Sequence, residues 1–312
     1  MISIAMTTYN GEKYVGEQID SILTQTISDF ELIICDDCSK DNTVEIIKEK
    51  QKTDNRIKLH LNDNNLGFKK NFEKAISLCS GEYVALSDQD DIWERNHLEL
   101  LYDNLGNYSL ACGNAIMIDQ YGQNKGVKLN EVEKLHFINN KNKLIYRILF
   151  YGNCFQGASM LFKKETINSY LPIPEKIPYH DVWFAACATL DKGIVYSFEI
   201  INRYRQHGSN ITFLRHNEYK RSFLKKITSK FRTFFGGIKT DRFDYCYELK
   251  KRYGLENPYF LEAYKIIESI RNKKISIKII KWFIKNYSDI VTEKTYRGLI
   301  KNIVIWCRWR KP

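Results

Sequence analysis

Residues 81–93 read Gly81-Glu82-Tyr83-Val84-Ala85-Leu86-Ser87-Asp88-Gln89-Asp90-Asp91-Ile92-Trp93, an apolar run that ends in three carboxylates. The run from Tyr83 to Leu86 predicts a short buried strand. Because side chains alternate along an extended strand, Asp88 and Asp90 are expected on the same side of its end. Like charges that close raise each other's pKa unless a cation lies between them. The stretch therefore predicts a site for a divalent cation, Mg²⁺ or Mn²⁺, of the kind that holds substrate phosphates, with a solvated acidic turn as the alternative.

The residues before this stretch alternate between strand and helix patterns. Strands are expected at residues 2–6, 30–35 and 57–61, and helices at 13–25, 42–52 and 68–78. This alternation predicts an α/β fold with a mostly parallel sheet flanked by helices. Ligands bind such sheets outside the carboxyl ends of the strands. Those ends are followed here by three polar pairs: Thr8-Tyr9, Asp36-Asp37, and Asp88 with Asp90.

The chain after residue 93 continues with further strands and one apolar helix. Strands are expected at 109–118, after Gly157, and at 193–201, and a helix is expected from 179 to 190. The polar segment 123–145 predicts a surface loop, a short helix or a lid. Gly157, which precedes an apolar strand, suggests close approach of the backbone to a ligand. Asp181 stands at the start of the helix, where an acid can serve as a cap or a partner of the helix dipole.

Composition limits the class of protein. The 312 residues are 44% hydrophobic, which is ample for a core, and no apolar run approaches the length of a membrane span. The N-terminal residues lack the features of a signal peptide, so a cytoplasmic protein is expected. Eight scattered cysteines include one close pair, Cys35 and Cys38, with no second pair to complete a zinc site. Reduced thiols are therefore expected.

The charge of the chain is unevenly distributed. Residues 1–214 hold 23 Lys and Arg against 28 Asp and Glu, whereas residues 215–312 hold 25 against 9. This contrast predicts a boundary near residue 214, between a domain at 1–213 and a helical basic region at 214–312. At 275–285, lysines at helical spacing form a stripe opposite Ile279, Trp282 and Phe283.

Basic amphipathic helices that carry tryptophan are typical of proteins that lie on an anionic membrane surface. The alternative is a helical appendage that packs on the catalytic domain or on another subunit, so a homo-oligomer stays open. Nucleic acid is a poorer partner for this region, because no zinc-finger, RNA-recognition or helix-turn-helix signature accompanies the charge.

The order of motifs resembles glycosyltransferase family 2, with the GT-A fold. The resemblance covers roughly residues 1–213 and rests on Thr8-Tyr9-Asn10, Gln25-Thr26, residues 36–41, Asn65-Leu66-Gly67, Gly81-Glu82-Tyr83 and residues 87–93. The last of these segments is similar to the branch that contains many bacterial rhamnosyltransferases and other surface-polysaccharide enzymes. Cys38 departs from the family pattern, where Gly or Asn is usual, and a cysteine tolerates a positive φ less well than glycine.

The resemblance implies an inverting, metal-dependent enzyme. It would move a sugar from a UDP-, dTDP- or GDP-linked donor to a glycan or lipid-linked acceptor. Thr8 and Tyr9 would contact the nucleotide, and Asp37 would bind the edge of the base. Asp88 would lie near the ribose, and the DXD motif would place Asp90 on the metal.

The resemblance also implies roles for the second half of the domain. Asp181 matches the acid that serves the family as general base, and His180 is the second candidate. The acceptor region would include Gln156, Gly157 and Trp183. Arg205 and His207, in one segment after the last strand, suit a diphosphate or its metal, so His207 joins Asp90 as a candidate metal ligand. A solvated basic loop is the alternative.

Other classes of protein fit the sequence less well. A catalytically inactive nucleotide- or glycan-binding module would have no need of Asp88, Asp90 and Asp181 together. A phosphohydrolase would carry its Asp-x-Asp motif after the first strand, whereas here it follows the fourth. A basic nucleic-acid-binding protein is the third alternative. Its affinity for DNA or RNA would fall steeply as the salt concentration rises.

Overall fold

A computed structural model describes residues 1–133, 141–152, 154–208, 241–272 and 276–290. Their contacts divide the chain into two compact units. The first contains residues 1–133 and 155–207, and the second contains the described parts of 134–154 and 208–312. The predicted boundary between 213 and 214 falls outside the described residues and stays a prediction. The sequence analysis did not expect the segment 134–154 to belong to the second unit.

The first unit alternates strands with helices along most of its length. Its first half comprises β1 (Ile2–Thr8), α1 (Val15–Leu23), β2 (Phe30–Asp36), α2 (Thr43–Thr53), β3 (Ile57–Leu61), α3 (Phe68–Leu78), β4 (Tyr83–Ser87), β5 (Ile92–Trp93) and α4 (His97–Leu105). Its second half comprises β6 (Leu110–Ile118), β7 (Asn124–Lys128), α5 (Leu129–Val132), β8 (Met160–Lys163), α7 (Lys164–Ser169), α8 (His180–Leu190) and β9 (Ile194–Arg205). A short 3-10 turn at Gly157–Ser159 precedes β8.

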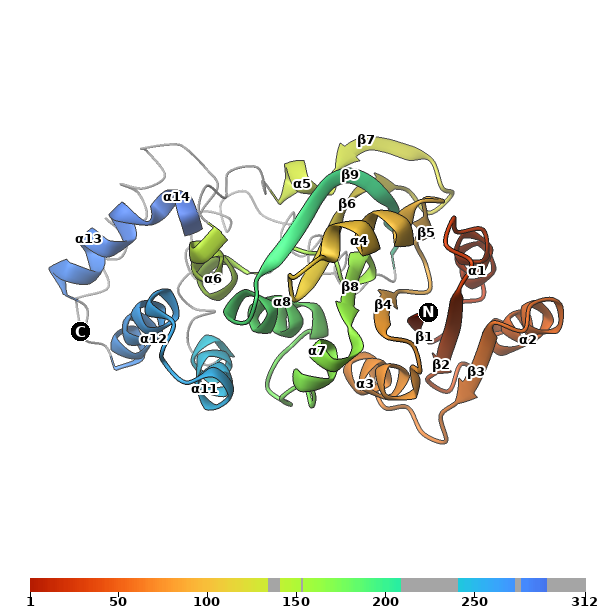
Figure 1. The fold of residues 1–312 in the computed structure, drawn as a ribbon, viewed down its shortest axis with the longest axis horizontal. Helices are drawn as coiled ribbons and strands as arrows, with labels where there is room; N and C mark the ends of the chain where they lie inside the picture. Colours follow the sequence, from red (N-terminus) through yellow and green to blue (C-terminus); the bar gives the residue numbers. More distant parts are fainter. Residues whose placement is uncertain (134–140, 153, 209–240, 273–275, 291–312) are drawn as a thin grey trace. The chain divides into compact units, whose positions relative to one another are not determined.

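The strands form one mixed sheet. Nine strands of the described chain take part, in the order β3-β2-β1-β4-β8-β6-β9-β5, with β7 beside β6 (Figure 1). The first four are parallel to one another, and β8 is antiparallel to both of its neighbours, so β6 and β9 run in the same direction as β4. The predicted α/β fold with a mostly parallel sheet is confirmed. The carboxyl ends of β1, β2, β4 and β9 therefore meet at one edge.

Helices cover both faces of this sheet because its central strands are apolar on both sides. Every residue of β2 is buried. On one face a single core cluster joins Ile4 and Leu32 of the sheet to Val15, Ile19 and Ile22 of α1 and to buried side chains of α2 and α4. On the other face α3 packs against β1 and β2 and presents Phe72, which also contacts α8.

Several boundaries differ from the sequence expectation. The strand expected at 193–201 continues to Arg205, because its outer half pairs with β6 and β5. The segment 123–145 is not simply a loop, since β7 pairs with β6 and α5 follows it. Residues 134–140 lie outside the described part of the chain. The seven described cysteines are free, as expected.

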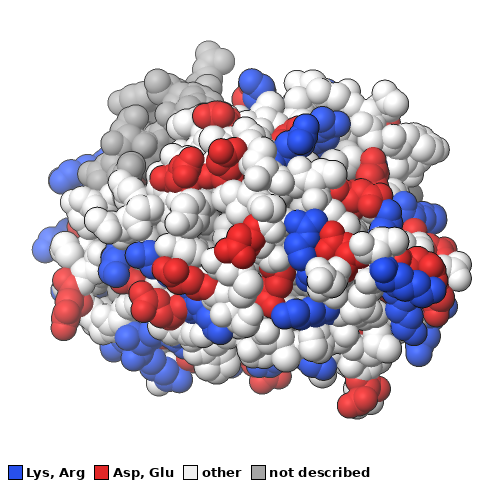
Figure 2. All heavy atoms as spheres, turned by 45° about the vertical axis from the view of Figure 1, so that its right-hand side comes forward, with Lys and Arg blue, Asp and Glu red and all other residues white. Residues whose placement is uncertain are grey.

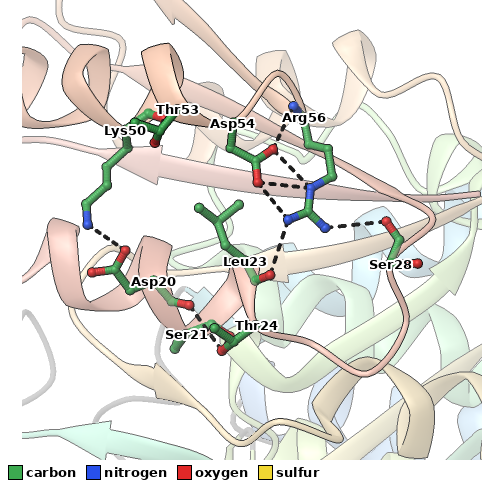
Figure 3. A network of polar contacts seen from close by, with 9 residues as sticks. All are labelled: Asp20, Ser21, Leu23, Thr24, Ser28, Lys50, Thr53, Asp54 and Arg56. Carbon is green, nitrogen blue, oxygen red and sulfur yellow. Dashed lines mark hydrogen bonds and ion pairs between the residues drawn. The ribbon is translucent and has the colours of Figure 1, made fainter.

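The amino end of the sheet, opposite the polar edge, is held by charged side chains (Figure 3). The guanidinium of Arg56 binds the Asp54 carboxylate at 2.7 Å and donates to the carbonyl oxygens of Leu23 and Ser28. It also lies 4.2 Å from the centre of the Phe30 ring. One side chain thus joins the end of α1, the loop before β2 and the start of β3.

The second unit is helical where it is described. It contains α6 (Leu144–Tyr146), a π-helical turn at Arg147–Tyr151, α11 (Asp241–Tyr253), α12 (Pro258–Arg271), α13 (Ile277–Lys285) and α14 (Tyr287–Ile290). Its core is aromatic: Tyr146 and Phe150 both contact the Trp282 ring, with centroids 4.9 and 5.4 Å apart. None of the helices described here is long and apolar enough to cross a membrane. The basic segments expected at 223–235 and 303–311 lie outside the described residues.

Charge on the first unit is mixed. Figure 2 turns the side with α1, α2 and β3 toward the viewer and shows acidic and basic side chains interspersed there. This distribution agrees with the near balance of charge counted over residues 1–214.

Glu31 offers a test of how the amino end of the sheet is stabilised. Its carboxylate is 4% exposed and accepts from Ser3 Oγ and Ser80 N, and it pairs with Lys58 at 2.6 Å. Burial raises the pKa of Glu31, but the bonds from Lys58, Ser3 and Ser80 outweigh it and lower the pKa to about 2. The ionised form therefore stabilises the fold above pH 4.5, and this contribution is lost as the pH falls toward 2. We expect Glu31→Gln to lower the free energy of unfolding by about 2–3 kcal/mol at pH 7 and by much less at pH 3.

Denaturant unfolding at the two pH values measures this difference. Glu49→Gln, at an acid whose side chain is 69% exposed, is the matched control and should change little at either pH. An equal loss of stability in Glu31→Gln at both pH values would show that ionisation of Glu31 contributes nothing.

Candidate active site

The carboxyl edge of the sheet gathers most of the polar residues that the sequence singled out. β1 and β2 end together, since Thr8 pairs with Asp36, and Met6 of β1 pairs with Ser87 of β4. The loops that follow these strands therefore start side by side. Their backbones leave the sheet ladder, and many of their N–H groups are bound by side chains instead.

Thr8 and Asp36 are internal parts of this edge. Thr8 is 1% exposed, and its Oγ1 donates to Asp36 Oδ2 at 2.8 Å. Asp36 also accepts from the backbone N–H of Ser39 at 2.9 Å. The side chain of Thr8, expected to contact a nucleotide, is thus occupied by Asp36, and only its backbone remains to make such a contact. Asp36 is therefore a buried carboxylate that caps the turn at Ser39.

Asp37 holds a neighbouring loop. It is 3% exposed, and it accepts hydrogen bonds from the backbone N–H groups of Leu66 and Gly67 at 2.7 and 2.8 Å and from Asn62 Nδ2 at 2.8 Å. Gly67, with φ of 76°, begins α3 at this point. These hydrogen bonds hold residues 62–67 in place. The contact between Asp37 and a nucleotide base stays a prediction.

Cys38 takes the conformation that the family pattern implies. Its φ is 68°, in the left-handed region that costs a non-glycine residue about 1–2 kcal/mol. Its thiol lies 3.2 Å from the carbonyl oxygen of Asn62. The departure from glycine therefore leaves the turn intact.

Gln89 joins the loop after β1 to the acidic loop after β4. Its Oε1 accepts from the backbone N–H of Tyr9 at 2.9 Å, and its Nε2 donates to the carbonyl oxygen of Tyr9 at 3.1 Å. A Cβ atom at Gly11 would lie 2.2 Å from Gln89 Oε1, so a side chain there would displace the Gln89 amide from Tyr9. The sequence analysis gave Gln89 no role; its signal was a long amide side chain between two acids.

Asp91 is the buried member of the acidic motif, and the sequence analysis gave it no role either. It is fully buried and accepts from Gln156 Nε2 at 2.7 Å, Asn202 Nδ2 at 2.9 Å and the backbone N–H of Arg205 at 3.0 Å. Burial and the Asp90 carboxylate raise the pKa of Asp91 to about 7, although its hydrogen bonds oppose them. The side-chain amide of Gln156, which was expected in the acceptor region, therefore donates to Asp91.

Asp88 lies among three further carboxylates. Burial raises its pKa well above the usual range, and Asp90, Asp91 and Asp181 raise it further. The last of these is informative, because Asp181 comes from α8, almost a hundred residues along the chain. The structure thus brings the acidic motif and the predicted general base into one cluster of negative charge.

Asp90 faces His207. His207 Nε2 lies 2.9 Å from Asp90 Oδ2, and its ring stacks at 4.7 Å from Tyr14. The two side chains that were predicted to bind a metal therefore converge, although no group of three or more such side chains occurs in the described chain. A carboxylate oxygen and an imidazole nitrogen at this spacing fit a Mg²⁺ or Mn²⁺ ion that takes its other ligands from water and phosphate.

Arg205 is buried and committed to the protein. Its guanidinium is 2% exposed; it binds Glu17 at 2.6 Å, donates from Nε to the carbonyl oxygen of Asp90 at 2.8 Å, and covers the ring of Tyr14. It is the last residue of β9 rather than part of a loop. Through these contacts Arg205 positions the acidic loop. The side chain of Arg205 is therefore not part of a solvated basic loop, which was the alternative in the sequence analysis.

Asp181 and His180 begin α8. The N-cap residue is Tyr179, so Asp181 is not the cap, and its Oδ1 accepts from the N–H of Val182 at 2.7 Å. His180 is 7% exposed and packs 4.1 Å from Phe72, and burial lowers its pKa to about 3. A ring enclosed in this way is poorly placed to meet an acceptor, which leaves Asp181 as the candidate base.

Gly157 and Trp183 serve the packing around α8. A Cβ atom at Gly157 would lie 2.7 Å from His180 Nε2, so the close approach predicted for Gly157 is to a protein ring rather than to a ligand. Trp183 is fully buried, and its Nε1 donates to the carbonyl oxygen of Tyr170 at 2.7 Å. Its side chain does not reach the surface, where the sequence analysis expected an acceptor contact.

Comparison with known proteins agrees with this arrangement. The sequence model of "Glycosyl transferase family 2" matches residues 3–166. A UDP-Glc:alpha-D-GlcNAc-diphosphoundecaprenol beta-1,3-glucosyltransferase of Escherichia coli is 29% identical over 266 residues, which cover 78% of this chain and 96% of that protein. An uncharacterized glycosyltransferase of Methanocaldococcus jannaschii is 32% identical over 212 residues, or 65% of this chain and 69% of that protein. Neither is named a rhamnosyltransferase, so that narrower resemblance stays an expectation.

Solved structures share the fold. Residues 1–349 of Staphylococcus aureus TarS, in complex with UDP-GlcNAc, superpose with a TM-score of 0.56 at 16% identity, over 92% of this chain and 91% of that one. The mannosyltransferase PcManGT of Pyrobaculum calidifontis, in complex with GDP-Man and Mn²⁺, has a TM-score of 0.56 at 15% identity, over 99% and 88%. The fold is therefore GT-A. With a family match over more than half of its length and this acidic site at the carboxyl edge of its sheet, the chain belongs to glycosyltransferase family 2.

Proposed function

We propose that this glycosyltransferase moves a sugar from a nucleotide-sugar donor to a lipid-linked glycan acceptor, with inversion at the sugar carbon C1, in the synthesis of a bacterial surface polysaccharide. The single observation that carries the proposal is the cluster of Asp88, Asp90 and Asp91 from the β4 loop with Asp181 from α8. Neighbouring carboxylates repel one another unless a bound cation offsets their charge or one of them takes up a proton.

The donor would bind along the carboxyl edge of the sheet. Tyr9, half exposed, and Asp37 are proposed to face the base, and Asp88 the ribose. UDP-, dTDP- and GDP-linked sugars all fit this description. The name of the Escherichia coli relative gives UDP-Glc as its donor, so a UDP-sugar is the first donor to test.

Asp90 and His207 would hold a divalent cation, Mg²⁺ or Mn²⁺. Such an ion, when bound, would offset the charge of the donor's diphosphate. The chain's own contribution is to keep the Asp90 carboxylate in place through Arg205, which binds the carbonyl oxygen of the same residue.

Asp181 would act as general base on the opposite side of C1. As the acceptor hydroxyl oxygen forms its bond to C1, the bond from C1 to the diphosphate oxygen breaks, and the electron pair leaves with the nucleotide diphosphate. The hydroxyl proton passes to the Asp181 carboxylate. The N–H of Val182 holds one oxygen of that carboxylate, so its orientation is set before the acceptor arrives.

The acceptor of the Escherichia coli relative is named as a diphosphoundecaprenol-linked sugar. A lipid-linked acceptor would bring the present enzyme to the cytoplasmic face of a membrane. A catalytically inactive nucleotide-binding module is the second candidate. It would bind the donor without turning it over.

The donor and the metal can be tested by calorimetry and thermal unfolding with UDP-, dTDP- and GDP-sugars, with and without Mn²⁺. A ligand at a hundredfold excess over its Kd stabilises the fold by about 2.7 kcal/mol. We expect stabilisation by one nucleotide class only when Mn²⁺ is present, and its loss in Asp90→Ala. Asp103→Ala, at an exposed acid of α4, is the control. Failure of every nucleotide to bind the folded protein would contradict the proposal.

The base can be tested by Asp181→Asn, which keeps the size of the side chain and removes its basicity. Turnover should fall by about 10²–10⁴-fold while the donor still binds, because general-base catalysis contributes that much. Donor binding by calorimetry and product formation by mass spectrometry separate the two effects. Near-normal turnover in the variant would rule out Asp181 as the base, and binding with no turnover in the wild type would favour the inactive module.

Gln89 can be tested as the residue that sets the distance between the loop of Tyr9 and the acidic loop. Gln89→Glu places a carboxylate oxygen where the amide donates to the Tyr9 carbonyl, which removes a bond and adds repulsion. The cost of about 1–3 kcal/mol should weaken nucleotide binding by about tenfold. Gln51→Glu is the matched control, since its Nε2 donates to the Ile57 carbonyl far from this edge. Equal nucleotide affinity in the two variants would show that Gln89 does not position the donor loop.

A further inference from the structure

Helix α13 (Ile277–Lys285) has one face packed in the second unit and one face exposed. Ile279 is 9% exposed, and the rings of Trp282 and Phe283 lie 5.4 and 5.3 Å from the ring of Phe150. The apolar face that the sequence analysis assigned to a membrane is therefore used internally. Trp282 is half-buried in this arrangement, so only part of its ring faces outward.

The exposed face of α13 has a different character. Ile277 is 72% exposed and Ile284 is 45% exposed, and Lys278, Lys281 and Lys285 are exposed beside them. At 100° per residue these five side chains occupy one continuous arc of about 120°, with the isoleucines at one margin and the lysines across the rest. We call these five residues the α13 outer face.

Among the residues that the structure describes, no acid forms an ion pair with a lysine of the α13 outer face. The helix itself contains no Asp or Glu. Two acids interact with the segment 143–146, which packs near the aromatic core: Glu262 accepts from Tyr146 Oη, and Asp289 binds Lys143 at 2.9 Å. Three lysine charges on one face are therefore left for an external anion, and the two exposed isoleucines lie next to them.

We propose that the α13 outer face adsorbs to an anionic phospholipid surface. Each lysine near such a surface contributes about 1 kcal/mol. Ile277 and Ile284 would enter the headgroup layer, where apolar side chains leave water. The isoleucines favour a lipid surface over nucleic acid, because a phosphate backbone offers them no apolar layer. This proposal stands apart from the proposed function, although it would bring the active site to a lipid-linked acceptor.

The test is co-sedimentation of the full chain with vesicles of 30% phosphatidylglycerol in phosphatidylcholine, and with pure phosphatidylcholine as reference. The probe contains no sugar or nucleotide, so a failure here is distinct from a failure of the proposed function. The wild type should bind the anionic vesicles and not the neutral ones, and binding should weaken as salt rises. The combined variant Lys278→Gln, Lys281→Gln and Lys285→Gln should bind about a hundredfold more weakly, from about 1 kcal/mol per lysine.

A matched control removes the same charge elsewhere. Lys48→Gln, Lys52→Gln and Lys128→Gln change three exposed lysines of the first unit and should leave vesicle binding within about twofold. Both triple variants should unfold at the wild-type temperature, since substitutions at exposed positions change stability by about 0.5 kcal/mol or less. Ile277→Ser with Ile284→Ser should weaken binding at high salt, where the lysines are screened.

Three results would overturn the proposal. Equal losses in the two lysine variants would mean that net charge alone governs binding. Undiminished binding in the α13 variant would place the contact elsewhere. A change in sedimentation coefficient with protein concentration, abolished by the α13 variant and without vesicle binding, would identify a second copy of the chain as the occupant.

Discussion

The active site depends on the burial of Asp91. Its carboxylate has no exposed surface, and it is satisfied by one amide from the segment before β8, one amide from β9 and one backbone N–H at the end of β9. Losing one of these donors would leave the buried carboxylate with an unsatisfied oxygen lone pair, at a cost of about 1–3 kcal/mol. Two segments that are distant in sequence, the one before β8 and strand β9, are thereby tied to the acidic loop that contains Asp88 and Asp90.

Negative charge at this edge is balanced from both sides. Arg205 lies beneath the acidic loop, where its guanidinium binds Glu17 and the carbonyl oxygen of Asp90, and its backbone N–H binds Asp91. His207 approaches Asp90 from the same strand end. Asp88, by contrast, meets carboxylates from Asp90, Asp91 and Asp181, and its pKa rises accordingly. The free site therefore favours whatever brings positive charge or gives up a proton, which is what a diphosphate-bound cation and an acceptor hydroxyl would do.

The loops at the carboxyl edge are ordered by side chains that bind backbone. Asp36 caps the turn at Ser39, Asp37 holds Leu66 and Gly67, and Gln89 pairs with both backbone groups of Tyr9. These bonds replace the sheet ladder where the strands end. Asp36 and Asp37, which are almost fully buried, therefore shape the loops, whereas Asp88 and Asp90 are the partly exposed carboxylates of the site.

The sequence by itself determined the α/β fold, the elements of the first unit and the edge where its polar residues meet. Apolar periodicity distinguishes strands from helices, and parallel strands direct their carboxyl ends to one side whatever the detailed packing. Only the tertiary structure decided which polar side chains face outward. Thr8, Trp183 and Arg205 are typical of binding sites in sequence, yet their side chains are enclosed, because burial depends on partners from other elements of the fold: Asp36 for Thr8, Tyr170 for Trp183 and Glu17 for Arg205. For the same reason, the sequence could not predict what covers the apolar face of α13. An amphipathic pattern identifies an apolar face but does not determine whether protein or lipid covers it, and in the structure Phe150 packs against this face.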